Sequence, residues 1–250
     1  MNFKEKYFYY KKSYLNLKKM LGGNLNDIQL NKDQLDKFSD EEIIYLQDDF
    51  MNDLKKKYPV TRYDNARSNP KYLMKNITYG EMNYEGMDIL IEHIHTVHKL
   101  TFTHFLDIGS GNGKLPLQVA ALSNVTKSIG IELVEERHAT AIKIKDELNY
   151  YKKIIDKVLF INDEFNNVKL VDYINDITLV WISNKCFTIE LTNKIFNELL
   201  NILPKGSIIS CSEKYSNIFI DTPKKLNIID NISVPMSWNT NSNIYIYKIE

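Results

Sequence analysis

The residues best suited to chemistry lie in one short glycine-rich segment, 105–114, which reads FLDIGSGNGK. Gly109 and Gly111 allow the backbone to approach a ligand closely, because no Cβ stands in the way. Asp107 precedes them at the expected carboxyl end of an apolar strand, where a carboxylate can accept hydrogen bonds from a ligand ammonium group. The segment therefore predicts a small-molecule site where a strand ends and a helix begins.

The spacing of these glycines favours one class of ligand. A dinucleotide site prefers a further glycine at position 114, where this chain has Lys114. The pattern D-x-G-x-G-x-G is instead similar to the loop that binds S-adenosylmethionine (SAM), in which no pyrophosphate has to be held. Glu132 and Asp163 end the next two expected strands, and such acids can accept hydrogen bonds from the ribose hydroxyls and the adenine amino group. The expected SAM-binding residues of the loop and the strand ends are Asp107, Gly109, Ser110, Gly111, Gly113, Lys114, Glu132 and Asp163.

Short apolar runs and longer amphipathic segments alternate around this loop. The expected strands are 101–108, 127–132, 158–161, 177–182 and 207–210, and the expected helices are 82–98, 113–122, 134–150, 166–174 and 188–202. Segments 225–233 and 243–249 read as two more strands with no helix between them. The pattern predicts an α/β fold with a mostly parallel sheet and a terminal antiparallel hairpin. This is the usual Rossmann-like architecture of class I SAM-dependent methyltransferases.

Residues 1–76, before that alternation, have a different sequence pattern. Apolar residues at spacings of three and four predict a helix over 40–57, and residues 58–76 read as an extended connector. We therefore expect a small helical N-terminal region and connector over 1–76 and a SAM-dependent catalytic domain over 77–250. Residues 1–20 hold six lysines against Glu5, which indicates a solvated helix face or a contact with DNA.

Several further motifs resemble one methyltransferase family. They are YGE at 79–81, LQVA at 117–120, GIE at 130–132, NDE at 162–164, SNKCF at 183–187, and Trp238 followed seven residues later by Tyr245. Together with DIGSGNG at 107–113, their order and spacing are similar to those of the disruptor-of-telomeric-silencing (Dot-one) histone-lysine methyltransferases. The resemblance covers about residues 70–250, and YGE with LQVA discriminates better than the glycine turn.

The resemblance implies roles for two further groups of residues. The loop Tyr79, Gly80 and Glu81 would close over the methionine end of SAM. The residues expected at the channel for the acceptor lysine are Trp181, Ser183, Asn184, Phe187 and Tyr245. The family's pattern N-N-F-A-F has its first Asn at position 183 and an aromatic residue at position 185, where this chain has Ser183 and Lys185. Lys114 stands where the family has Gln, and Glu164 stands where the family has Phe.

Composition limits the classes of function. The formal net charge is zero and the pI is about 7.0, which excludes binding to nucleic acid through bulk positive charge alone. Two cysteines are too few for a disulfide scaffold, and the spacing of His93, His95 and His98 does not put all three on one helix face, so no metal site is expected. No apolar run reaches the length of a signal peptide or a membrane span, so we expect a soluble, intracellular protein without a membrane partner.

The strong preference for Lys over Arg, with many Ile and Asn, suggests an AT-rich genome such as that of a parasite, an endosymbiont or a large DNA virus. The resemblance implies a nucleosomal histone as the substrate, with the nucleus or a viral factory as the location. Two alternatives stay open at this point. The chain could be a class I methyltransferase for a non-histone protein, a nucleic acid or a small molecule, or a SAM-binding module without catalysis.

Overall fold

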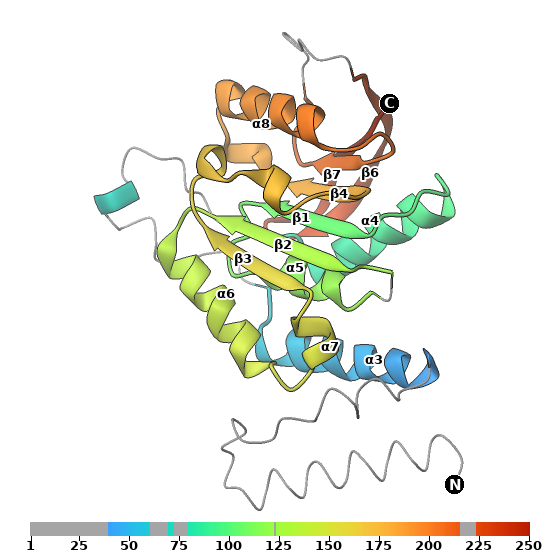
Figure 1. Cartoon of the computed structure of the whole chain (residues 1–250), viewed down its shortest axis with the longest axis vertical. Coiled ribbons are helices and arrows are strands. Elements are labelled where there is room, and N and C mark those ends of the chain that lie inside the picture. Colours follow the sequence, from blue (N-terminus) through green and yellow to red (C-terminus); the bar gives the residue numbers. More distant parts are fainter. Residues whose placement is uncertain (1–39, 61–69, 73–79, 123, 216–223) are drawn as a thin grey trace, which may run out of the picture.

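A computed structural model describes residues 40–60, 70–72, 80–122, 124–215 and 224–250 (Figure 1). Within them the chain forms a sheet of seven strands in the order β3-β2-β1-β4-β5-β7-β6. The strands are β1 (His104–Ile108), β2 (Lys127–Glu132), β3 (Val158–Asn162), β4 (Thr178–Ile182), β5 (Ile208–Cys211), β6 (Leu226–Met236) and β7 (Asn239–Ile249). The first five are parallel, and β7 runs antiparallel to both β5 and β6. The predicted α/β sheet with its terminal hairpin is confirmed.

Both faces of the sheet are covered by helices (Figure 1). Strand β4 shows the division, because Leu179 and Trp181 point to one face and Val180 and Ile182 to the other. On the first face lie α4 (Tyr84–Thr96), α5 (Lys114–Ala120), α6 (Glu135–Glu147) and α7 (Lys152–Ile155). On the second face lies α8 (Ile189–Ile202), whose amphipathic side chains pack on the sheet through Ile195, Phe196 and Leu199.

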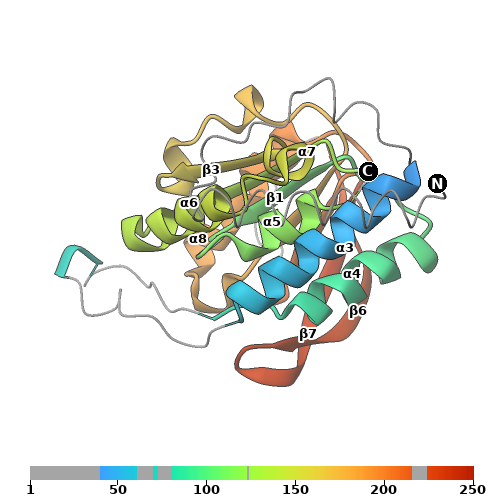
Figure 2. The same ribbon diagram turned by 90° about the horizontal axis from the view of Figure 1, so that it is seen from below.

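The predicted helix before the connector is α3 (Asp40–Lys57), which Figure 2 shows on the same side of the sheet as α4 and α5. Near its end, Lys55 Nζ lies 3.8 Å from Asp88 Oδ2 of α4. Phe50 and Leu54 are fully buried in the cluster that also contains Leu117 of α5. The Tyr84 hydroxyl of α4 donates to the backbone carbonyl of Tyr58, directly after α3. This helix therefore shares a core with the sheet domain.

One predicted helix is wrong. Residues 166–174 form two separate 3₁₀ turns, Phe165–Asn167 and Leu170–Asp172, on the α8 face of the sheet. Helix-like spacings separate four buried residues here, Phe165, Val168, Leu170 and Ile174. Phe165 and Leu170 lie in the two turns, and Val168 and Ile174 lie after them, so no single helix holds all four. Two more 3₁₀ turns, Pro70–Tyr72 and Asn184–Cys186, were not predicted, and neither was α7.

None of the helices in the described part of the chain combines the length and the apolar composition that crossing a bilayer requires.

Candidate functional site

A cavity of about 330 Å³ opens at the carboxyl ends of the parallel strands, where ligands bind in open α/β sheets. Most of the residues predicted from the sequence line it. They are Gly80, Glu81, Asp107, Gly109, Ser110, Gly111, Lys114, Glu132, Asp163, Trp181, Ser183 and Phe187. The structure thus gathers both predicted groups, the SAM-binding residues and part of the acceptor channel, around one space.

The three glycines of the turn do different things. Gly109 and Gly111 have φ values of 82° and 54°, in the left-handed region that favours glycine, and both line the cavity. Gly113 also has a left-handed φ, but it lies outside the cavity lining, and a Cβ there would be 2.4 Å from Phe160 Cζ. Gly113 therefore allows α5 to pack closely on β3, while the other two shape the cavity.

Ser110 lies against the neighbouring strand. A Cβ on Gly130 would be 2.7 Å from its Oγ, which explains why the GIE motif needs a glycine. The Ser110 Oγ is buried and has no hydrogen-bond partner among the described residues.

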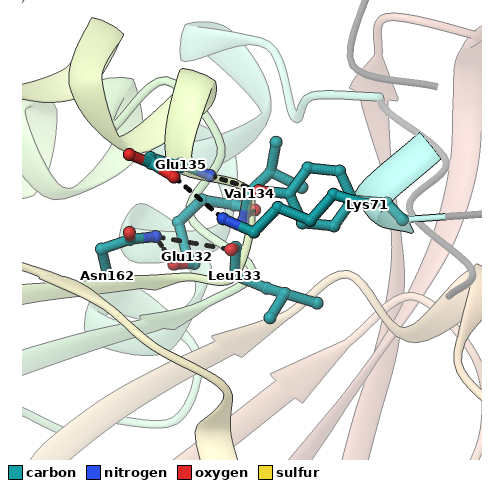
Figure 3. Close-up of polar contacts among 7 residues, drawn as sticks. Lys71, Glu132, Leu133, Val134, Glu135 and Asn162 are labelled. Atoms are coloured by element: carbon teal, nitrogen blue, oxygen red, sulfur yellow. Dashed lines mark hydrogen bonds and ion pairs between the residues drawn. The ribbon is translucent and has the colours of Figure 1, made fainter. Parts of the chain in front are cut away.

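Glu132 at the end of β2 fixes two backbone segments at the edge of the cavity. Its Oε2 accepts from the Gly111 N–H at 2.7 Å, and its Oε1 accepts from the Val134 N–H at 2.7 Å. Arg137 Nη1 lies 3.9 Å from Oε1, and the Asn162 side chain donates to the Glu132 backbone carbonyl. The carboxylate therefore joins the glycine turn to the start of α6, as Figure 3 shows on the α6 side.

The short turn at residues 70–72 also contacts the start of α6 (Figure 3). The Tyr72 hydroxyl accepts from the Glu135 N–H at 3.0 Å, and Lys71 Nζ donates to the Glu135 carboxylate at 2.9 Å. Tyr72 is buried beside Val134. The β2–α6 loop that follows Glu132 is thus contacted by a segment from the connector.

Asp107 is the electrostatic centre of the cavity. Its side chain is completely buried at the end of β1, and burial together with the charges of Glu132 and Glu81 raises its pKa well above the usual range for an aspartate. A cationic ligand would relieve this repulsion among three carboxylates. These carboxylate acceptors therefore fit a ligand with a net positive charge better than a phosphate.

Lys114 forms a buried ion pair that the sequence did not reveal. Its Nζ lies 3.0 Å from Glu81 Oε2, and both side chains are almost fully buried. The same ammonium group donates to the Pro59 carbonyl at 2.7 Å. Lys114 therefore ties the Glu81 segment and the connector after α3 to the first turn of α5.

Gly80 and Glu81 are held by the β6–β7 hairpin. The Glu81 N–H donates to the Ser237 Oγ at 2.9 Å, and the Ser237 N–H donates to the Glu81 carbonyl at 2.8 Å. A Cβ on Gly80 would be 2.5 Å from Trp238 Cε3, so only glycine lets the indole lie this close. Tyr79, the first residue of the motif, lies outside the described residues.

The predicted acceptor residues divide into two groups. Trp181, Ser183 and Phe187 line the cavity, whereas Asn184 and Tyr245 do not. Asn184 is buried, and its Oδ1 accepts from the Glu213 N–H and the Ser212 hydroxyl, so it supports the loop after β5.

The structure also shows which residues surround Tyr245 and Lys185. Tyr245 pairs with Cys211 of β5 and packs on the core of the α8 face. Lys185 places its Nζ 5.8 Å from the centre of the Trp238 ring, a cation–π distance.

Sequence reasoning missed several cavity residues. Phe165 is the most informative, because it follows Asp163 by two positions and places an aromatic ring in the cavity although Glu164 occupies the expected aromatic position. An aromatic residue one position downstream was the available signal. Arg137, Thr188, Leu191 and Ile195 come from α6, α8 and the N-cap of α8, and only their side-chain directions in the fold bring them to the cavity.

Comparison with protein families gives one match over most of the chain. The model of the family described as histone methylation protein DOT1 matches residues 64–244. A relative from Caenorhabditis elegans, "Histone-lysine N-methyltransferase, H3 lysine-79 specific", is 32% identical over 149 residues. That alignment covers 56% of this chain and 15% of the relative, so the chain spans a small part of that protein's length.

Solved structures give weaker likenesses. An RNA methyltransferase from Salinibacter ruber in complex with S-adenosyl-L-homocysteine is 13% identical with a TM-score of 0.45, over 64% of this chain and 90% of that one. A putative rRNA methylase from Clostridium thermocellum is 17% identical with a TM-score of 0.46, over 66% and 98% of the two chains.

Proposed function

The chain belongs to the DOT1 family of histone methylation proteins, and from this membership and the cavity we propose that it is a SAM-dependent methyltransferase whose acceptor is a lysine in the globular core of nucleosomal histone H3. The observation that carries the proposal is that separate motifs of the sequence meet at one cavity. The motifs YGE, DIGSGNG and GIE are separate in the sequence, yet each contributes residues to the lining of one cavity, namely Gly80 and Glu81, residues 107–111, and Ile131 with Glu132.

The charges and shape of the cavity fit SAM, which carries an ammonium group and a sulfonium group. Asp107 would accept from the ammonium group, and the left-handed backbone at Gly109 and Gly111 leaves room for the methionine chain. Glu132 would accept from the ribose hydroxyls with the remaining acceptor capacity of its two oxygens. Asp163 and Phe165 would hold the adenine, one through its amino group and the other through its ring face.

When bound, SAM supplies an electrophilic methyl group on sulfur. The protein then has to align a neutral amine with that methyl group and exclude water. Trp181 and Phe187 provide an apolar wall on the acceptor side. An acceptor lysine has a reference pKa near 10.4, and desolvation against this wall lowers that pKa, which favours the neutral, reactive amine. We propose that the proton leaves through solvent as the side chain enters.

The direct test is methyl transfer from labelled SAM to recombinant nucleosomes and to free histones in parallel, with the modified residue mapped by mass spectrometry. Label on a lysine of the globular surface of histone H3 supports the proposal, and the Asp107→Asn variant, assayed at a SAM concentration near the Kd of the parent, serves as the control with reduced transfer. SAM binding measured in the same preparation separates a failed acceptor from a failed cofactor site.

A second candidate is methylation of a different acceptor. Lys185 on the Trp238 ring, Ser183 in place of Asn, and the position of Asn184 and Tyr245 away from the cavity favour this candidate. SAM binding without transfer to either histone substrate would support it, and would equally support a module that binds SAM without catalysis.

We also propose a second contact with the nucleosome and a location in the cell. Residues 1–20 lie outside the described residues, and their six lysines are proposed to contact nucleosomal DNA. Deleting them should weaken nucleosome binding and reduce its salt dependence, because fewer counterions are released. Unchanged affinity and salt slope would contradict the DNA contact. A histone acceptor places the protein in the nucleus, or in a viral factory if the chain is viral.

A further inference from the structure

Two histidines and an aspartate meet at the C-terminal end of α4, against β6. His93 lies in the last turn of α4, His98 follows that helix, and Asp230 lies in β6. The two Nε2 atoms lie 2.8 Å and 3.2 Å from the same Asp230 Oδ2. From this convergence we propose that His93, His98 and Asp230 bind a zinc ion that joins α4 to β6.

The backbone brings these side chains together by two local departures from regular structure. Five residues of straight helix would put His93 and His98 on different faces, but the chain leaves the helix after Thr96. Lys99 has a φ of 53°, and the Leu100 N–H returns to the Ile94 carbonyl at 3.2 Å, so the chain folds back over the last turn. A register shift in β6 between Ile228 and Asp230 gives the strand a bulge at the aspartate.

The chemistry of the cluster fits zinc. Two imidazole nitrogens and one carboxylate oxygen are common zinc ligands, and water can complete a four-coordinate shell. The three ligand atoms lie within 4.8 Å of one another. A tetrahedral zinc with bonds near 2.0–2.1 Å needs ligand atoms roughly 3.3–3.4 Å apart, so small side-chain rotations are sufficient.

The surroundings also favour a cation. Asp230 Oδ1 accepts from the Asn231 N–H, which leaves Oδ2 directed at the two histidines. The site lies at the C-terminal end of α4, where the helix dipole is negative. All three side chains are partly exposed, so an ion can enter from solvent.

The test uses the full chain without a histidine tag, after treatment with a chelator. Adding ZnSO₄ at roughly 100 times its Kd should raise the Tm by about 5–10 °C, because the ion binds only the folded state. Metal analysis after dialysis should give one zinc per chain. Co²⁺ in place of zinc should give the visible absorption of a tetrahedral site.

Three variants decide whether the ion is held by these residues. His98→Ala and Asp230→Asn should each weaken zinc binding at least about tenfold and remove the Co²⁺ absorption. His138→Ala, which removes a histidine from α6, is the matched control and should bind zinc as the parent does. A parent protein without a Tm shift or bound zinc would overturn the proposal, and so would zinc binding that persists unchanged in both cluster variants.

Discussion

The cavity has two parts that are built differently. The first, which we call the donor half, is formed by Asp107, the turn 109–111, Glu132 and Asp163. The second, which we call the acceptor half, combines the proposed acceptor wall of Trp181, Ser183 and Phe187 with Gly80–Met82, whose first two residues are proposed to close over the methionine end of SAM. The donor half joins neighbouring strand ends, and its bond from Gly111 to Glu132 spans 21 residues. The acceptor half depends on the bond from Glu81 to Ser237, which spans 156 residues. Local motifs therefore specify the first half, whereas the whole topology specifies the second.

The largest effect is expected at the ion pair that connects the two halves. Lys114→Met should lower the free energy of unfolding by about 3–5 kcal/mol, because Glu81 loses its buried cationic partner. Lys143→Met is the matched control, since Lys143 pairs with Glu147 on the exposed face of α6 and should cost only about 0.3–0.5 kcal/mol. Urea denaturation followed by circular dichroism measures both. Equal losses in the two variants would show that the buried pair does not join the halves.

Asp107→Asn should weaken SAM binding about 10- to 100-fold, because it removes a charge-assisted hydrogen bond of about 1.5–3 kcal/mol from the donor half. Isothermal titration calorimetry measures the affinity. For the parent, SAM binding should strengthen as pH rises through the raised pKa of Asp107, because the bound state favours the carboxylate. The variant should lack this pH dependence.

The same aspartate makes a prediction for the protein without cofactor. Its folded-state pKa lies above its unfolded value, so its contribution to stability is complete below the unfolded pKa and is lost as pH rises through the folded pKa. Asp107→Asn should therefore be more stable than the parent at neutral pH while binding SAM less well. A variant that loses stability at neutral pH would contradict the repulsion among the three carboxylates.

Gly80→Ala tests the acceptor half. Its Cβ would overlap the Trp238 ring, so we expect a loss of about 1–3 kcal/mol in the free energy of unfolding. Combining it with Trp238→Leu should recover part of that loss, and a double-mutant cycle from thermal denaturation gives the coupling. Additive effects would mean that the indole does not constrain Gly80.

Tyr245→Phe should have the smallest effect. The ring is kept and the residue does not line the cavity, so SAM affinity should stay within about twofold of the parent. Methyl-transfer rates over a pH range give the sharper readout. A lower rate at unchanged SAM affinity would place the hydroxyl in the acceptor path, and loss of an ionisation would identify it as a base, contrary to deprotonation through solvent.

For a physical reason, the sequence predicted which residues of the donor half meet at one cavity, while their contacts with SAM stay predictions. Strand β2 and helix α3 have the predicted bounds, and the acids at the strand ends meet because parallel strands end at one edge. The hydrogen-bond partners of these acidic side chains could not be predicted from the sequence. That Glu132 holds two backbone N–H groups depends on the path of the β2–α6 loop, which no spacing rule supplies.

The acceptor half was predicted only through the family resemblance, and unevenly. Trp181 and Phe187 line the cavity as expected, but Asn184 supports a neighbouring loop and Tyr245 packs on the core of the α8 face. The sequence also did not predict the cluster of His93, His98 and Asp230, because helical periodicity assumes that α4 continues past Thr96. Tertiary contacts decided each of these placements.

The hydrogen bonds between Glu81 and Ser237 also determine when the wall of the cavity can be completed during protein synthesis. The wall of the cavity formed by Gly80 and Glu81 leaves the ribosome early, yet the hairpin that holds it is made more than 150 residues later. The nascent chain can form the turn after β1 while this wall still lacks its partner. A ribosome-bound chain ending before β6 should therefore leave the Gly80–Glu81 side of the pocket unsupported, and cofactor retention should begin only when the hairpin has emerged.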